Sequence, residues 1–136
     1  MADGNNILEN IDYLPHNVEA EQALLGTILV NNEVYEAVSP IVQYEHFFDP
    51  VHARIFEIIS QKIQKNALAS PVTIKTYFHD DPALAELGGP TYLVKLASSA
   101  ISNYAAKEFA ELIRDMSLRR SLLTVAEEIS QKAKTV

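Results

Sequence analysis

The chain has 136 residues and a formal net charge of −7, with 48% hydrophobic and 21% charged residues. This size and usage are typical of one globular domain and exclude a wholly disordered chain. No apolar run approaches the roughly 20 residues that a membrane-spanning helix requires, and residues 1–10 are too polar and acidic for a signal peptide. The absence of cysteine excludes disulfides, a thiol nucleophile and cysteine-ligated metal centres. We therefore expect a cytoplasmic protein without a membrane segment.

Charge is distributed unevenly along the chain. Residues 1–53 contain nine acidic residues and no Lys or Arg, whereas residues 54–136 contain eleven basic and nine acidic residues, so the two parts carry −9 and +2. Binding to phosphate backbones depends on clustered Lys and Arg. We therefore expect little direct nucleic-acid binding by this chain.

The first elements predicted are a flexible segment over residues 1–14 and an amphipathic helix over residues 18–30. Asn17 is suited to cap this helix, and its apolar residues recur at spacings of three and four. Gly26 in its middle would cost about 1 kcal/mol relative to Ala, so we expect another backbone to pass close to it. A short second helix is predicted from Glu33 to about Val38.

Asp-Pro and Gly-Gly-Pro sequences predict three further helix starts, at residues 49–50, 81–82 and 88–90. The first of these helices carries one apolar stripe and is expected to stop near Asn66, and the last to stop near Ser98.

Another short helix is predicted between the first two of these starts. Thr73 is its expected cap, and Val72 and Tyr77 have the spacing of a hydrophobic staple around it.

The C-terminal residues 102–136 lack Pro and Gly and predict a helix of roughly 50 Å. Its apolar residues form two stripes. The first stripe consists of Phe109, Leu112, Ile113, Met116 and Leu123. The second begins about 200° round the helix from Met116 and consists of Leu118, Leu122, Val125 and Ile129. One stripe can lie on a globular core, which leaves the other for a partner. The alternative is a single helix that curves over one core and buries both stripes as one wide apolar face.

No segment shows the sustained alternation of a strand. We therefore predict an all-α fold: a globular bundle of about six helices over residues 15–101, with a long protruding C-terminal helix over residues 102–136.

The sequence offers little support for catalysis. Its glycines permit neither of the glycine-rich phosphate-binding motifs, so no nucleotide site of that kind can be formed. A metal-dependent hydrolase would have to use His46, His52 or His79, which do not have the spacing of a metal motif. His52 is better explained as a core histidine whose ring nitrogens are hydrogen-bonded. We predict no catalytic, cofactor-binding or metal-binding residues.

One basic cluster lies in the long helix. It consists of Arg114, Arg119 and Arg120, and it could contact phosphates or an acidic protein surface. Pairing with Glu111 or Asp115 on the helix surface is the simpler explanation. A helix-turn-helix DNA-binding role for this cluster is a weaker alternative.

Four blocks of the sequence, correctly ordered and spaced, resemble the N-terminal domain of bacterial DnaB-type replicative DNA helicases. They are residues 15–26 (PHNVEAEQALLG), 46–56 (HFF and HARIF), 88–93 (GGPTYL) and 118–123 (LRRSLL). The first block is highly specific and the others are weaker alone. The chain departs from the usual pattern at Thr73, where Asp is common, and at Phe109, where Tyr is common.

The resemblance implies a helical domain joined, in the whole protein, to an ATPase motor that binds ATP, Mg²⁺ and DNA and is absent from this chain. Domains of this family pair through a hairpin of two long helices, of which residues 102–136 resemble the first. They form dimers, and three dimers build a collar on the hexameric motor. The collar recruits the C-terminal domain of primase and, in some systems, a helicase loader. The acidic first part of the chain would then be a candidate docking surface.

The resemblance and the apolar stripes together predict a non-catalytic assembly domain of a replicative helicase. The expected self-association residues are Leu118, Leu122, Val125 and Ile129. The alternatives are the helicase-binding domain of a primase and an independent helical adaptor; the block over residues 15–26 favours the helicase over both.

Overall fold

The structure is a computed structural model that describes residues 13–135, a range that contains seven α-helices, two short 3₁₀-helices and no strand. The expected flexible segment over residues 1–14 lies outside the described range except for its last two residues. In chain order the elements are α1 (Val18–Val30), α2 (Val34–Val38), η4 (Tyr44–His46), α3 (Pro50–Gln64), α4 (Pro71–Ile74), η5 (Lys75–Phe78), α5 (Pro82–Glu86), α6 (Pro90–Ser98) and α7 (Asn103–Lys134).

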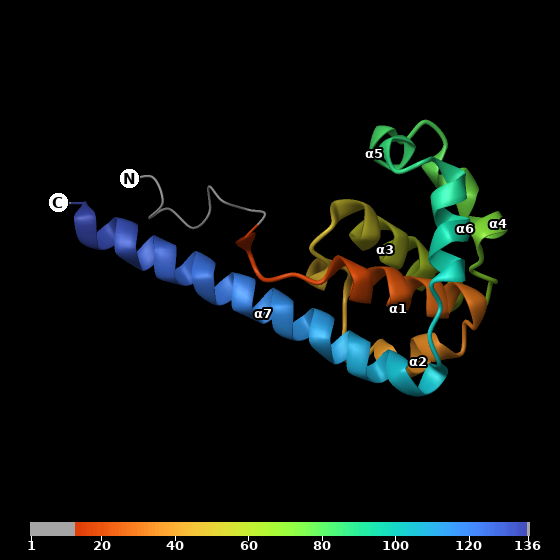
Figure 1. The fold of residues 1–136 in the computed structure, drawn as a ribbon, viewed down its shortest axis with the longest axis horizontal. Coiled ribbons are helices and arrows are strands. Elements are labelled where there is room, and N and C mark those ends of the chain that lie inside the picture. Colours follow the sequence, from red (N-terminus) through yellow and green to blue (C-terminus); the bar gives the residue numbers. More distant parts are fainter. Residues whose placement is uncertain (1–12, 136) are drawn as a thin grey trace.

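Helix α1 is central, and α2, α3, α6 and α7 pack around it. Helices α4 and α5 lie beside α6 at one end of the molecule (Figure 1). Helix α7 has 32 residues, about 48 Å at 1.5 Å per residue, so it runs past α1 and α2 and continues well beyond the globular part. The predicted all-α fold with a long C-terminal helix is confirmed. None of the helices over residues 13–135 has the length and apolar character needed to cross a membrane.

The burial of α1 differs from the prediction. Helix α1 has the predicted bounds, but it is not amphipathic in the sense of one buried and one exposed side. From Ala20 to Leu29 every residue except Gln22 is buried, because neighbouring helices cover α1 on several sides. The core around it includes Leu24, Ile28 and Leu96.

Local capping signals place most of the helix ends correctly. Asn17, Asp49 and Asp81 each accept a hydrogen bond from a backbone N–H in the first turn of the helix that follows. Asn66 has a φ of 60° directly after α3, the left-handed conformation that ends many helices.

The prediction for Thr73 is wrong. The cap of α4 is Ser70, whose side chain accepts from the Thr73 backbone N–H, while the Thr73 hydroxyl accepts from the Ser70 backbone N–H. This reciprocal pair starts the helix at Pro71, which suits a first helical position. Val72 and Tyr77 are 69% and 55% exposed, so they do not act as a buried staple.

Gly26 is the point of closest approach between α1 and α6. A Cβ atom built there would lie 1.8 Å from the Leu96 carbonyl oxygen and 2.7 Å from its carbonyl carbon. Since both atoms belong to backbone, no side-chain movement could relieve the clash. The expected close approach at this glycine is therefore present.

We predict that Gly26→Ala destabilises the protein by more than about 2 kcal/mol, because α6 must move away from α1. The free energy of unfolding in urea measures the loss. Helix propensity alone would stabilise this variant by about 1 kcal/mol, so the sign distinguishes the two effects. Ala126→Gly on the exposed part of α7 is the control, with an expected loss of at most about 1 kcal/mol. A Gly26→Ala variant as stable as the wild type would contradict the packing.

Candidate functional site

The predicted second stripe of α7 is exposed in the structure. Its members are 50–63% accessible: Leu118 58%, Leu122 61%, Val125 50% and Ile129 63%. They follow one another at spacings of four, three and four residues, so they form a continuous row along one side of the helix. Large apolar side chains arranged contiguously in water usually mark a surface that another molecule covers.

A different side of α7 faces the core. Ala106, Ala110 and Ile113 are buried there, and Phe109 and Leu112 pack against the core from its margin. Ile113 and Leu118 are five residues apart, which is about 140° round the helix. Because α7 is straight and long, its first half is held by the core while the exposed row continues along the projecting half.

The three arginines of α7 do not form one patch. Arg119 is exposed and its Nε donates to Asp115 Oδ2 at 2.8 Å, four residues earlier on the helix. Arg114 is also exposed and borders a hollow between η4 and α7. Arg120 is half-buried and is engaged by the chain's own backbone. Contact of the three arginines with a partner or with phosphate stays a prediction.

Arg120 fastens α7 to two other segments. Its two terminal nitrogens donate to the Pro15 carbonyl at 2.7 Å and to the His46 carbonyl at 2.8 Å. Its guanidinium also lies 5.4 Å from the ring centroid of Phe48, within range of a cation–π interaction. Burial lowers the pKa of Arg120, an effect that the Glu21 carboxylate opposes, and a guanidinium remains charged in any case.

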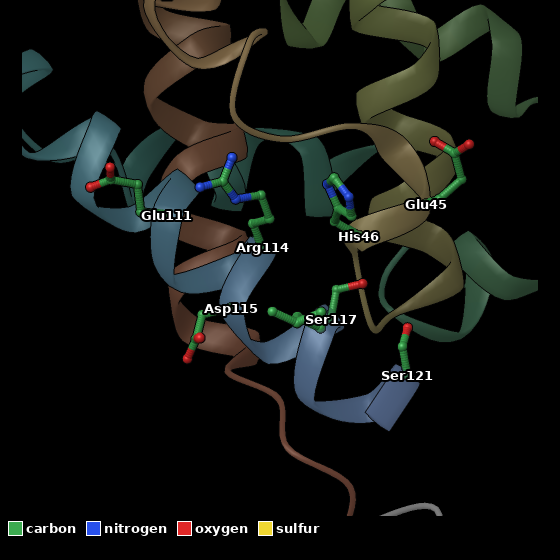
Figure 2. A pocket seen from close by; sticks show the side chains of 8 residues that line it. Glu45, His46, Glu111, Arg114, Asp115, Ser117 and Ser121 are labelled. Carbon is green, nitrogen blue, oxygen red and sulfur yellow. The ribbon is translucent and has the colours of Figure 1, made fainter. Parts of the chain in front are cut away.

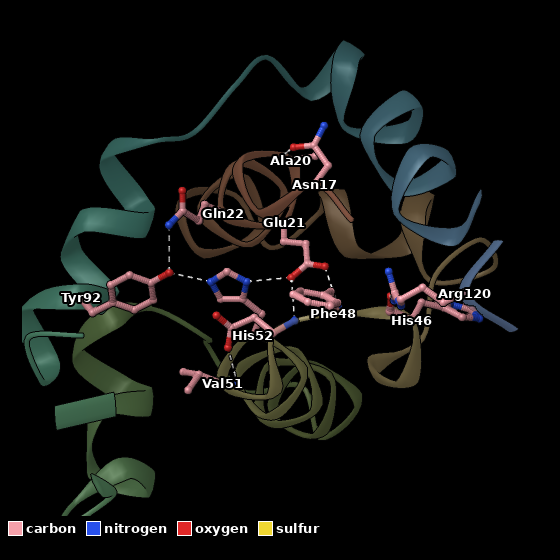
Figure 3. Close-up of polar contacts among 11 residues, drawn as sticks. Asn17, Ala20, Glu21, Gln22, His46, Phe48, Val51, His52, Tyr92 and Arg120 are labelled. Atoms are coloured by element: carbon pink, nitrogen blue, oxygen red, sulfur yellow. Dashed lines mark hydrogen bonds and ion pairs between the residues drawn. The ribbon is translucent and has the colours of Figure 1, made fainter. Parts of the chain in front are cut away.

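Phe48 has two further contacts. Its ring stacks on His16, with the ring centroids 4.1 Å apart, and its backbone N–H donates to Glu21 Oε2 at 2.7 Å. The His16 ring in turn donates from Nδ1 to the Leu14 carbonyl at 2.6 Å. The segment before α1 and the segment before α3 therefore meet at Phe48, where Arg120 joins them to α7 (Figure 3).

Glu21 belongs to a buried polar network that connects α1, α3 and α6 (Figure 3). Its carboxylate accepts from the backbone N–H of Asp49 at 3.3 Å as well as from that of Phe48, and from His52 Nδ1 at 2.9 Å. The other ring nitrogen of His52 lies 2.6 Å from the Tyr92 hydroxyl. Glu21 and His52 are 1% and 0% exposed, so nearly all their polar atoms depend on these partners.

The two ring nitrogens of His52 have different partners. With a neutral ring, Nδ1 donates to the Glu21 carboxylate and Nε2 accepts from the Tyr92 hydroxyl. That hydroxyl accepts from Gln22 Nε2 at 3.1 Å. Burial raises the pKa of Tyr92, so the hydroxyl keeps the proton that it donates. The prediction that His52 is a hydrogen-bonded core histidine fits this network, which joins α1, the segment before α3, α3 itself and α6.

The hollow between η4 and α7 is open and contains both charge signs (Figure 2). It measures about 700 Å³, and Glu45, His46, Glu111, Arg114 and Asp115 contribute its charged and imidazole groups. Burial lowers the pKa of His46; Glu45 opposes this shift, and Arg114 and Arg120 reinforce it. The neutral ring accepts the Gln43 backbone N–H at Nδ1, 2.8 Å away. Polar groups of this kind beside an exposed apolar row are typical of the rim of a protein interface.

The histidines considered for a metal site do not converge. His52 is buried with both nitrogens bonded, His46 lies in the hollow beside α7, and His79 is exposed beside Asp80 at 3.4 Å. Within residues 13–135 no group of three or more His, Asp or Glu side chains is arranged to hold a metal ion.

We predict that Arg120→Ala loosens the attachment of α7 and costs about 1–3 kcal/mol in the free energy of unfolding, because two backbone carbonyls lose a charged donor. Arg120→Lys should recover only part of the lost free energy of unfolding, since an ammonium group cannot place two donors in the fixed planar arrangement of a guanidinium. Removing the exposed pair through Arg119→Ala is the control and should cost at most about 0.5 kcal/mol.

The same variants test whether Arg120 sets the direction of α7. The chain has no cysteine, so spin labels can be attached at Gln61→Cys on α3 and Lys132→Cys on α7 without other changes. The distance distribution between the labels should broaden for Arg120→Ala and stay narrow for Arg119→Ala. A distribution unchanged in both variants would show that core packing alone directs α7.

Comparison with known proteins agrees with this architecture. The family described as "DnaB-like helicase N terminal domain" matches residues 13–115. The chain is 34% identical over 135 residues to a protein named "Replicative DNA helicase DnaB" from Rickettsia typhi, covering 94% of this chain and 27% of the relative, and 35% identical to its counterpart from Rickettsia conorii, covering 98% and 27%. The chain thus spans about a quarter of the length of these relatives.

A solved structure has the same fold. The crystal structure of the N-terminal domain of DnaB helicase from Mycobacterium tuberculosis superposes with a TM-score of 0.82 at 23% identity, over 90% of this chain and 89% of that one. The family match covers most of the described chain, including the buried network and the first half of α7. On this evidence the chain belongs to the family of DnaB-like helicase N-terminal domains.

Proposed function

We propose that this chain is the assembly domain of a replicative DNA helicase. It associates with copies of itself through α7 and recruits primase, and no reaction is catalysed on it. The observation that carries the proposal is the exposed row of Leu118, Leu122, Val125 and Ile129 on the projecting half of α7. In the whole protein, ATP, Mg²⁺ and DNA would be bound by a motor outside this chain, in the cytoplasm. The family assignment favours this function over a primase domain or an independent adaptor.

The projecting half of α7 has a physical need for a partner. Beyond Ile113, its apolar side chains are only partly covered or exposed within the described chain. Most helix stability in proteins comes from packing of an apolar face, and burying each Leu, Val or Ile gains about 1.5–3 kcal/mol. A second apolar helix laid along the row would supply that burial.

The spacing of the row suits pairing with an identical row. A four-three-four spacing reads the same in both directions, so two antiparallel copies can be related by a twofold axis near residues 123–124. Leu118 then faces Ile129 of the other copy, and Leu122 faces Val125. Such a contact is self-complementary, as a twofold interface requires. In a larger collar, three such dimers would surround the motor ring.

We predict that Leu122→Asp/Ile129→Asp converts a self-associating chain into a monomer and weakens association at least about 100-fold, because two buried apolar contacts are replaced by charges. Sedimentation equilibrium measures the change, and circular dichroism should show unchanged helicity because both positions are exposed. Thr124→Asp/Gln131→Asp is the matched control: it adds the same charge at the same seven-residue spacing to exposed positions on the other side of the same helix. A wild-type chain that sediments as a monomer at high concentration would contradict self-association.

The primase partner has a separate test. Adding the C-terminal domain of the cognate primase to the full 136-residue chain should produce a faster-sedimenting complex. The acidic first part of the chain is the candidate docking surface for this partner. Reversing charge at two exposed acidic positions, through Glu33→Lys/Glu36→Lys, should weaken that complex if this surface is used. A sedimentation profile equal to the sum of the separate components would exclude recruitment by this domain. A helicase loader is a further candidate partner for the same assay.

A further inference from the structure

A second group of exposed apolar side chains lies at the end of the molecule opposite the free end of α7 (Figure 1). Val72 on α4 and Val94 on α6 are 69% and 60% exposed, although valine is usually buried. Helices α4 and α6 pack against each other and leave a groove of about 180 Å³ between them. The groove is lined by Pro71, Val72, Lys75, Pro90, Thr91 and Val94.

The two segments that form this groove contain no acidic residue. Residues 58–79 and 87–107 have five lysines and neither Asp nor Glu, in a chain whose net charge is −7. Lys75 lines the groove itself, and Lys95 follows Val94 on the exposed side of α6. The segments that form the groove therefore carry a net positive charge, in contrast with the chain as a whole.

Three acidic residues lie between these two segments in sequence. Glu86 is exposed at the end of α5, one residue before the second segment. Asp81 accepts from Arg54 at 2.6 Å and caps α5, and Asp80 lies 3.4 Å from His79. Both border a separate hollow between η5 and α5. None of these three carboxylates lines the α4–α6 groove, and neither Lys75 nor Lys95 forms an ion pair within the described residues, so both are available for carboxylates from outside.

We propose that the α4–α6 groove binds an acidic, amphipathic peptide segment of another protein. An apolar side chain of the segment lies between Val72 and Val94, and flanking carboxylates pair with Lys75 and Lys95. The apolar lining and the positive rim favour this occupant over nucleic acid. Two lysines neutralise few phosphates, and apolar side chains do not bind a phosphate group. This binding uses no residue of α7, so it is independent of the proposed self-association.

Nuclear magnetic resonance of the full 136-residue chain labelled with ¹⁵N tests the proposal with defined probes. The first probe is a 12-residue synthetic peptide that combines Glu with Leu at helical spacing. A second has Lys in place of Glu, a third has Ser in place of Leu, and a fourth probe is a 12-nucleotide oligo-dT. We expect the first probe to shift the amide resonances of Val72, Lys75 and Val94, and the other three to bind at least about tenfold more weakly.

Two variants connect the binding to the groove. Lys75→Glu/Lys95→Glu and Val72→Ser/Val94→Ser should each weaken binding of the first peptide at least about tenfold. Both change exposed side chains, so unaltered circular dichroism should accompany them. Lys107→Glu/Lys132→Glu makes the same charge change at exposed positions of α7 and should leave the affinity within about twofold.

Several results would overturn the proposal. Equal binding of the Leu-containing and Ser-containing acidic peptides would reduce the groove to a nonspecific positive surface. Equal binding of oligo-dT would assign it to nucleic acid instead. Shifts of the α4 and α6 resonances that depend on protein concentration alone would make a second copy of the chain the occupant. Shifts confined to α7, or none, would exclude the groove as a peptide site.

Discussion

The arrangement of the whole molecule depends on one buried carboxylate. Glu21 is 1% exposed in the central helix α1, where an ion without partners would cost several kcal/mol. Its three donors come from the backbone before α3 and from the side chain of His52. Satisfying the carboxylate therefore fixes the position of the η4–α3 connection relative to α1. Through His52 and Tyr92 the same network reaches α6.

The same carboxylate influences the exposed face of α7 indirectly. The Phe48 backbone that Glu21 holds carries the ring on which Arg120 lies, and Arg120 also binds the Pro15 and His46 carbonyls. Arg120 and Leu118 are two residues apart, about 200° round the helix. Anchoring one side of the helix at Arg120 therefore leaves the row that begins at Leu118 exposed, with Leu118 and Val125 bordering open hollows beside the globular part. The internal polar contacts and the apolar row are two consequences of one helix orientation.

The helices were predictable from the sequence because their signals are local. Asn17, Asp49 and Asp81 cap helices through bonds to residues two or three positions away, and such contacts do not depend on the rest of the fold. Thr73 failed as a cap because Ser70 offers an equivalent hydroxyl directly before a proline, and local reasoning did not weigh the two against each other.

The polar contacts of the site were less predictable because they join residues far apart in sequence. The buried position of Glu21 was not predicted, although its spacing from Leu24, Leu25 and Ile28 places it on a buried side of α1. Arg120 was grouped with its neighbour Arg119, although it lies seven residues, two helical turns, from the buried Ile113. Helical angle was the available signal in both cases. Their partners, the Phe48 N–H and the Pro15 and His46 carbonyls, could only be known once the segments were packed.

The two exposed apolar surfaces differ in chemistry, which argues for different partners. The row on α7 has a spacing that reads the same in both directions, as pairing with an identical chain requires. The groove between α4 and α6 has lysines on its rim and no acidic residue in the segments that form it. Its positive charge therefore complements an acidic partner. They lie at opposite ends of the molecule, with α1 and its buried network between them. A domain built this way can hold copies of itself together at one end while the other end stays accessible to a different protein.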